Sequence, residues 1–282
     1  YMVQLIDSVQ DIADQFDAIV FDQWGVLHNG QSALPGALHA LQRLRKHRAK
    51  LAVLSNSGKR AAPNAARIAA KGFDITQFDT IMTSGEALWR KFAADENQAY
   101  KVIPIVGAVG DATCGADGLA LTVTSQTSDA DAILLMGLPD GTAPEDYDTV
   151  LMAGRDNDLP LYCSNPDLKS PRGHATYVMS PGVLAQRYRD MGGTTHLFGK
   201  PHPEIFSALQ AALNCAPGKI LMVGDSLHHD IKGANTAGWG SLLICSGIHA
   251  PDIGVDTMTD DIIQLAASAH TAPPTFFLPD LR

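Results

Sequence analysis

The sequence predicts an α/β protein built on a doubly wound parallel sheet. Short apolar runs alternate along the chain with segments of helical periodicity. The runs are almost continuously apolar, which is typical of parallel strands that are covered on both faces. With 282 residues, of which 45% are hydrophobic and 18% charged, the chain has the composition of a folded globular protein. This length suits one large domain or two smaller ones.

Short apolar runs of three to five residues mark the expected strands. In chain order they are Ala18–Phe21, Leu51–Leu54, Thr80–Met82, Val102–Val106, Ala132–Met136, Pro160–Cys163, Ile220–Val223 and Leu242–Cys245.

Helices are expected between these runs. The segment PGALHALQRLRKH places four apolar residues on one helical face, namely Ala37, Leu38, Leu41 and Leu44. Ser84 is a suitable cap for SGEALWRKFAA. PEIFSALQAAL opens on Pro203 and Glu204, which favour a first helical turn.

Charge and cysteine content exclude several classes of function. A net charge of −9 argues against a general nucleic-acid or membrane-surface binder, although a locally basic pocket can still hold a small anion. The 4 cysteines are far apart and form no C-x-x-C pair, so we expect reduced thiols. No apolar run is long enough to cross a bilayer, and the first residues do not resemble a signal peptide. We therefore expect a cytoplasmic protein.

Polar residues follow four of the predicted elements. Asp22 and then Gly25 follow the first strand, and the segment SNSGKR, residues 55–60, follows the second. HLFGKP supplies Lys200, and GDSLHHD after Ile220–Val223 supplies Asp225, Ser226 and Asp230. Because active sites of doubly wound sheets lie at the carboxyl ends of strands, we expect these residues to converge. Each alone has an ordinary structural explanation, as a cap, a turn residue or a surface lysine; their joint placement favours a site.

These residue types suit phosphoryl transfer. Two adjacent carboxylates, Asp22 and Asp225, repel unless a cation lies between them, and Mg²⁺ is the cation that oxygen ligands favour. Ser55, Asn56 and the turn at Ser57 can donate hydrogen bonds to a phosphate, whose charge Lys200 would help to neutralise. Asp22 could then attack phosphorus and form an aspartyl-phosphate that water hydrolyses.

Four segments resemble the ordered motifs of the haloacid dehalogenase-like superfamily: FDQWGVLHNG, LSNSGKR, FGKPHPEIF and LMVGDSLHHDIKGANTAGW. More narrowly they resemble subclass IIA, which contains pyridoxal phosphatases and 4-nitrophenylphosphatases. SNPD and SPGVL, residues 164–167 and 180–184, are also similar to that subclass.

The resemblance implies a Rossmann-like core interrupted by a C2-type α/β cap. Mapped onto this chain, the core is 1–97 and 180–282, and the cap is 98–179. By the same resemblance Asp22 is the nucleophile and a Mg²⁺ ligand, together with Asp225 and the main-chain carbonyl of Trp24. Ser55, Asn56, Ser57 and Lys200 would bind phosphate, and Gly25, Ser226 and Asp230 would support the loops.

The first motif departs from the family at Trp24. Phosphatases of the family have an aspartate there, which protonates the leaving oxygen and then activates water. Indole has no such acidity. Three interpretations stay open: a weak phosphatase in which Trp24 packs, a protein with non-phosphatase chemistry, and a non-catalytic binder of a phosphometabolite. His28, His228 or His229 could replace the missing base, although a structural role is the ordinary explanation for each.

The expected ligand is a small phosphorylated metabolite, with no nucleic acid or membrane partner. No aromatic cluster in the cap sequence suggests stacking on a nucleobase or a pyridoxal ring. Caps of this size often form dimer contacts in relatives, so a homodimer is expected. The tail TAPPTFFLPDLR should pack on the core or on a neighbouring subunit.

Overall fold

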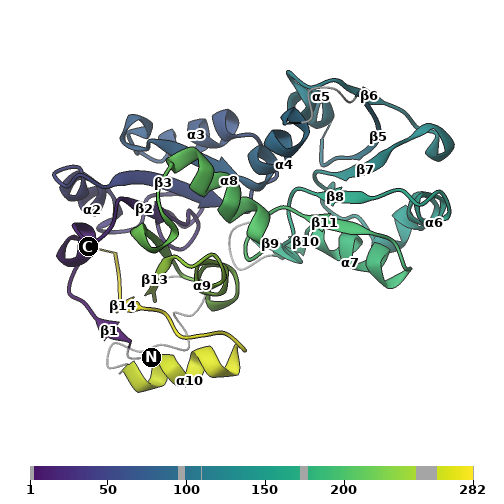
Figure 1. Ribbon diagram of the computed structural model, residues 1–282. Coiled ribbons are helices and arrows are strands. Elements are labelled where there is room, and N and C mark those ends of the chain that lie inside the picture. The colour runs from purple at the N-terminus through teal and green to yellow at the C-terminus, as the bar shows by residue number, and fades with distance from the viewer. Residues whose placement is uncertain (1–2, 95–98, 109, 172–176, 246–258, 282) are drawn as a thin grey trace. The chain divides into compact units, whose positions relative to one another are not determined.

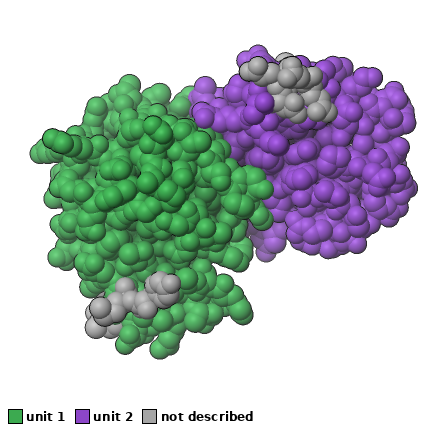
Figure 2. All heavy atoms as spheres, viewed as in Figure 1, with its two compact units in different colours: residues 1–55, 65–82, 200–282 green, residues 56–64, 83–199 purple. Residues whose placement is uncertain are grey.

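The computed structural model describes residues 3–281 apart from 95–98, 109, 172–176 and 246–258 (Figure 1). Contacts between residues divide the chain into two compact units (Figure 2). The first unit contains residues 1–55, 65–82 and 200–282, and the second contains 56–64 and 83–199.

A seven-stranded sheet forms the centre of the first unit, in the order β1-β14-β13-β12-β2-β3-β4. Its strands are β1 (Gln4–Leu5), β2 (Ala18–Phe21), β3 (Lys50–Ser55), β4 (Thr80–Thr83), β12 (Ile220–Gly224), β13 (Gly240–Ile244) and β14 (Phe276–Leu278). The central strand β2 pairs in parallel with β12 on one side and with β3 on the other. The predicted parallel α/β sheet is therefore confirmed.

Both faces of this sheet are covered, as a doubly wound fold requires. Along β13, Leu242 and Ile244 belong to one apolar core, whereas Leu243 belongs to the other. This alternation arises because successive strand side chains point to opposite faces. The helices that contain residues of this unit are α1 (Gln10–Ala13), α2 (Ala37–Leu44), α3 (Ala61–Ala69), α8 (Pro203–Leu213), α9 (Lys232–Thr236) and α10 (Thr259–Ser268).

Three local expectations can be compared with these elements. Leu38 was expected on the buried face of α2, but it is 39% exposed, and Ala40 is buried instead. Thr83 rather than Ser84 caps α4, because its hydroxyl accepts a hydrogen bond from the Glu86 N–H at 2.9 Å. The C-terminal tail packs on the core of its own chain, where β14 pairs with β13 and with β1.

A five-stranded sheet in the order β11-β8-β7-β5-β6 forms the centre of the second unit, and each of its neighbouring pairs is parallel. Its strands are β5 (Tyr100–Ile105), β6 (Leu121–Val123), β7 (Ala132–Leu135), β8 (Leu161–Cys163) and β11 (Thr195–Leu197). A separate antiparallel pair consists of β9 (Lys169–Pro171) and β10 (Tyr177–Met179).

Four helices accompany these strands: α4 (Ser84–Ala93), α5 (Asp111–Ala116), α6 (Asp148–Asp156) and α7 (Gly182–Asp190). Tyr188 of α7 is fully buried in this unit's core, and its hydroxyl donates to the Leu159 carbonyl at 2.6 Å. The predicted cap, 98–179, lies within this unit, which also contains α4, α7 and β11. The limits of the cap as a domain stay a prediction. Among the described residues, no helix combines the length and the apolar character needed to traverse a bilayer.

Candidate active site

Three adjacent strands of the first unit end in the polar residues that the sequence singled out. Asp22 follows β2, Asp225 follows β12, and Ser55 is the last residue of β3. The register aligns Phe21 with both Val223 and Val53, so the three strands end at the same edge of the sheet. The sequence-based expectation that Asp22 and Asp225 follow neighbouring strands is confirmed.

Lys200 lies beside the nucleophile candidate. Its Nζ is 2.7 Å from Asp22 Oδ1 and donates to Asp230 Oδ1 at 2.6 Å. The lysine is only 3% exposed, so an unpaired ammonium there would be costly. Burial opposes its charge, but the carboxylates of Asp22 and Asp230 outweigh that effect and raise the pKa of Lys200. Lys200 is therefore a fixed positive charge at the strand ends.

Asp230 holds the loop that follows β12. Its Oδ2 accepts the N–H of Ser226 at 3.0 Å, and Ser226 Oγ in turn accepts the N–H of His229 at 3.1 Å. The residues from Leu227 to Ile231 form one π-helical turn. With one carboxylate oxygen on Lys200 and the other on the loop backbone, Asp230 ties both segments together.

The turn after Asp22 explains what Trp24 contacts. Gly25 adopts a φ of 88°, a left-handed conformation that favours glycine, and its N–H donates to the His28 carbonyl at 2.9 Å. The indole of Trp24 lies against Gly30, where an added Cβ would be 3.3 Å from Nε1. Trp24 thus packs within the loop that follows β2.

The segment after β3 enters the second unit at Asn56. Within that unit, Asn56 Nδ2 donates to Asp167 Oδ1 at 2.7 Å. Ser57 Oγ accepts the N–H of Lys59 at 3.3 Å, and its carbonyl accepts the N–H of Gly85 at 3.1 Å. Asp167 belongs to the SNPD motif, but the sequence pattern indicates no role for it. Its contact with Asn56 is evident only in the folded structure.

Three carboxylates could hold a divalent cation. Asp22, Asp225 and Asp230 each offer an oxygen, and these atoms lie within 4.8 Å of one another. An oxygen-only donor set fits Mg²⁺ or Ca²⁺ and disfavours metals that prefer sulfur or imidazole. Because both Asp230 oxygens already accept hydrogen bonds, Asp22 and Asp225 are the better ligands. Burial raises the pKa of Asp22, although the neighbouring Lys200 lowers it. A bound cation would favour the charged carboxylate and so oppose the effect of burial.

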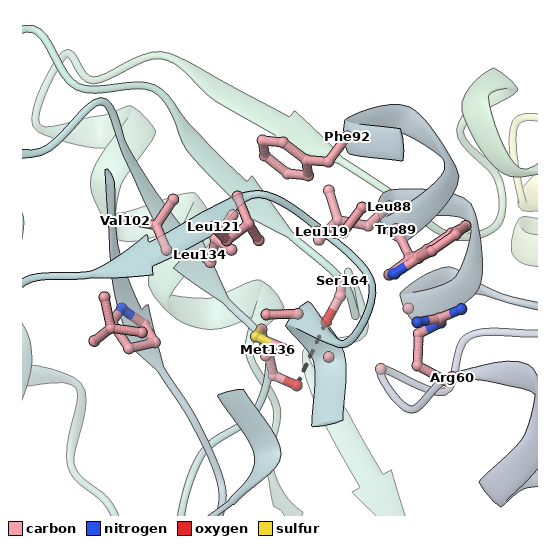
Figure 3. A pocket seen from close by; sticks show the side chains of 16 residues that line it. Arg60, Leu88, Trp89, Phe92, Val102, Leu119, Leu121, Leu134, Met136 and Ser164 are labelled. Carbon is pink, nitrogen blue, oxygen red and sulfur yellow. Dashed lines mark hydrogen bonds between the residues drawn. The ribbon is translucent and has the colours of Figure 1, made fainter. Parts of the chain in front are cut away.

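An apolar pocket lies elsewhere, inside the second unit (Figure 3). Leu88, Trp89 and Phe92 of α4 face it, and the Arg60 guanidinium lies 4.1 Å from the centre of the Trp89 ring. Arg60 also donates to Glu86 at 2.7 Å. Among the described residues that line this pocket there is no acidic side chain, and Asp22, Lys200 and Asp225 do not belong to the lining.

The second unit also contains an aromatic cluster, in which Tyr162 of the predicted cap meets Phe92 and His196 from outside it. Tyr162 and His196 are stacked with ring centres 4.7 Å apart, and Phe92 meets Tyr162 edge-on at 5.2 Å. Tyr162 and His196 are register partners on β8 and β11, so their side chains share one face of the sheet. These rings are far apart along the chain, so only the fold brings them together.

Comparison with known proteins assigns the family. A model described as haloacid dehalogenase-like hydrolase matches residues 19–115, and a second, described as HAD-hydrolase-like, matches residues 197–282. The chain belongs to the haloacid dehalogenase-like hydrolases, as its motifs predict, and its relatives support subclass IIA within them.

Among the similar proteins is rat chronophin (Rattus norvegicus), 26% identical over 277 residues that cover 96% of this chain and 87% of the relative. The solved structure of a haloacid dehalogenase-like hydrolase from Brucella suis is 29% identical, with a TM-score of 0.79, and covers 98% of this chain and 100% of its own. Glycerol phosphate phosphatase from Mycobacterium tuberculosis, solved in complex with magnesium, is 25% identical, with a TM-score of 0.73 over 98% of this chain and 78% of that one.

Proposed function

We propose that this protein is a Mg²⁺-dependent phosphatase that hydrolyses a small phosphorylated metabolite through a phosphorylated Asp22. The observation that carries the proposal is the meeting of Asp22, Lys200 and Asp225 at one edge of the sheet. The D-glycerol 3-phosphate phosphatase of Mycobacterium tuberculosis, 27% identical over 246 residues, supports a phosphometabolite as substrate.

The reaction has two displacements at phosphorus. Asp22 attacks the phosphoryl group, an Asp22–phosphorus bond forms, and the bond to the leaving oxygen breaks. A water oxygen then attacks the same phosphorus, which releases inorganic phosphate and restores the Asp22 carboxylate. Lys200 balances charge on the phosphoryl oxygens during both steps, and Ser55 holds the group in line. Asn56 and Ser57 stay phosphate ligands predicted from the sequence.

Asp22, Asp225 and the Trp24 carbonyl would hold the cation, and Asp230 would keep their loop in place. A bound Mg²⁺ would supply positive charge to the phosphoryl oxygens and relieve the repulsion between the acidic groups. Every residue at position 24 has a main-chain carbonyl, so a substitution of Trp24 can restore an acidic side chain without removing this metal ligand.

Trp24 makes the predicted enzyme slow toward poor leaving groups. It offers no proton to the leaving oxygen, and the loss of a general acid typically costs about 10²–10⁴ in rate. Aryl phosphates and mixed anhydrides need that proton least, so they should be the best substrates. Alkyl phosphates should be the worst.

The test is hydrolysis of 4-nitrophenyl phosphate and of glycerol 3-phosphate in the presence of Mg²⁺. We expect turnover of the aryl ester by the wild type and none by Asp22→Asn. Trp24→Asp should raise turnover of the alkyl ester, because it supplies an acid at the position used by the family.

Trp24→Asn is the matched control, since it removes the indole and adds no acid. It should leave the preference for aryl esters unchanged. A wild type that hydrolyses neither ester but still binds phosphate would be a phosphometabolite-binding protein instead. Activity that survives Asp22→Asn would remove Asp22 as the nucleophile. The cytoplasmic location and the homodimer stay predictions from the sequence.

A further inference from the structure

Gln23 lies between the proposed nucleophile and Trp24, and no motif in the sequence indicates a role for it. Its side chain is buried, with 7% of the residue exposed. The Gln23 Oε1 atom accepts a hydrogen bond from Ser55 Oγ at 3.2 Å. Its Nε2 is buried and has no acceptor among the described residues. The Gln23 amide, next to Asp22, is thus hydrogen-bonded through Oε1 to Ser55, the predicted phosphate ligand.

This arrangement is costly for a group that only packs. A buried amide donor without an acceptor typically destabilises a folded protein, and an apolar side chain of the same shape would avoid that cost. Buried polar atoms without partners are uncommon in folded proteins, so each calls for an explanation. Because Gln23 contacts Ser55, we look for that explanation in phosphate binding.

Counting donors and acceptors shows what a bound phosphate requires. Phosphate oxygens that carry charge accept hydrogen bonds, and Ser55 has a single hydroxyl proton to give. If that proton turns to the phosphate, Gln23 Oε1 loses its donor. A half-turn of the amide then brings Nε2 to Ser55 Oγ, where it donates to the oxygen lone pair that has become available.

We propose that Gln23 is a positioning residue whose amide turns when phosphate binds, so that the Ser55 hydroxyl donates to the phosphate instead of to Gln23. The proposal rests on the proposed function, because it assumes that Ser55 binds the phosphoryl group. In the structure Ser55 donates to Oε1; with phosphate present, Nε2 would donate to Ser55. Nε2, which has no acceptor among the described residues, would then gain one, while Oε1 gives up its donor.

The variant Gln23→Met tests the proposal because it keeps the shape of the side chain and removes both polar atoms. Two changes of opposite kind are expected. The melting temperature should stay level or rise, since the donor without an acceptor is gone. The Kd for inorganic phosphate, measured by calorimetry with Mg²⁺, should rise about threefold to tenfold, the equivalent of one ordinary hydrogen bond. The KM for 4-nitrophenyl phosphate should also rise, by a larger factor than that by which kcat falls.

A double-mutant cycle with Ser55→Ala decides whether Gln23 acts through Ser55. In the Ser55→Ala background, Gln23→Met should change the phosphate Kd by less than about twofold, because its partner is absent. Equal effects in both backgrounds would overturn the proposal, and so would a Gln23→Met protein with a lower melting temperature and unchanged phosphate binding.

The two proposals fail in different ways. If the wild type binds phosphate and shows the expected coupling but hydrolyses no ester, the phosphatase assignment fails and the role of Gln23 stands. If the wild type hydrolyses esters and Gln23→Met matches it in both Kd and KM, the role of Gln23 fails and the phosphatase assignment stands.

Discussion

At the scale of single residues, His28 shows how burial decides a protonation state. His28 is 8% exposed, and its Nδ1 accepts the N–H of Gly30 at 3.1 Å, so this nitrogen carries no proton. Burial, followed by the charges of Lys71 and Arg67, lowers the pKa of His28 from 6.5 to about 4. His28 is therefore neutral near pH 7 and packs in the loop that contains Trp24, which fits the structural role considered for it.

This lowered pKa predicts a loss of stability in mild acid. Between about pH 6.5 and pH 4 the unfolded chain takes up a proton on His28 that the folded chain does not. The free energy of unfolding therefore decreases as the pH is lowered through that window. Below about pH 4 both states are protonated, and this loss ends. His28→Asn keeps an acceptor for Gly30 but does not titrate. Its urea-unfolding free energy should fall less than that of the wild type between pH 7 and pH 4.5.

His39→Asn, at an exposed position on α2, is the matched variant with which His28→Asn is compared. If His28→Asn and the wild type lose the same free energy of unfolding over this range, His28 is not the group responsible.

At the scale of elements, the end of β12 is packed too closely for any side chain at Gly224. A Cβ added there would lie 2.2 Å from Asp230 Cβ and 2.4 Å from Asp230 Oδ2. The strand end and the turn that carries Asp230 are therefore in direct contact. This contact places Asp230 where it can bind both Lys200 and the Ser226 N–H.

Gly224→Ala should therefore damage both stability and the site. We expect a loss of about 1–3 kcal/mol in the free energy of unfolding from overpacking, and a large fall in 4-nitrophenyl phosphate turnover because Asp230 must move. Gly218→Ala is the control: an added Cβ there has no atom within 4 Å, and φ is not positive, so stability should stay level or rise slightly. An active, stable Gly224→Ala protein would show that Asp230 can move without consequence.

At the scale of the whole molecule, the first unit is assembled from three separate parts of the chain. Asp22 comes from the first part, and Lys200 and Asp225 come from the last. A cation that binds Asp22 and Asp225 bridges these parts in the folded protein only, since the unfolded chain holds them far apart. Binding to the folded state alone stabilises it by mass action.

Mg²⁺ should therefore raise the melting temperature of the wild type, and a chelator should reverse the effect. At a free Mg²⁺ concentration 100 times the Kd, the gain in the free energy of unfolding is about 2.7 kcal/mol. Asp225→Asn should lose most of this gain, whereas Asp129→Asn, an exposed carboxylate of the second unit, should keep it. Equal Mg²⁺ stabilisation of Asp225→Asn and the wild type would place the cation elsewhere.

The sequence by itself determined the fold class, the family and the strand ends from which Asp22, Ser55 and Asp225 emerge. It could do so because apolar periodicity and short motifs are local properties, and parallel strands bring their carboxyl ends to one edge. It also pointed to Lys200 and Asp230 through the family motifs.

Only the tertiary structure decided the contacts between residues that are distant along the chain. These are the contact of Gln23 with Ser55, that of Asn56 with Asp167, and the stacking of Tyr162 on His196. The exposure of Leu38 and the packing of the C-terminal tail were likewise decided by the tertiary structure. Hydrogen bonds and burial depend on atoms brought close by folding, and a linear pattern does not specify which of them meet.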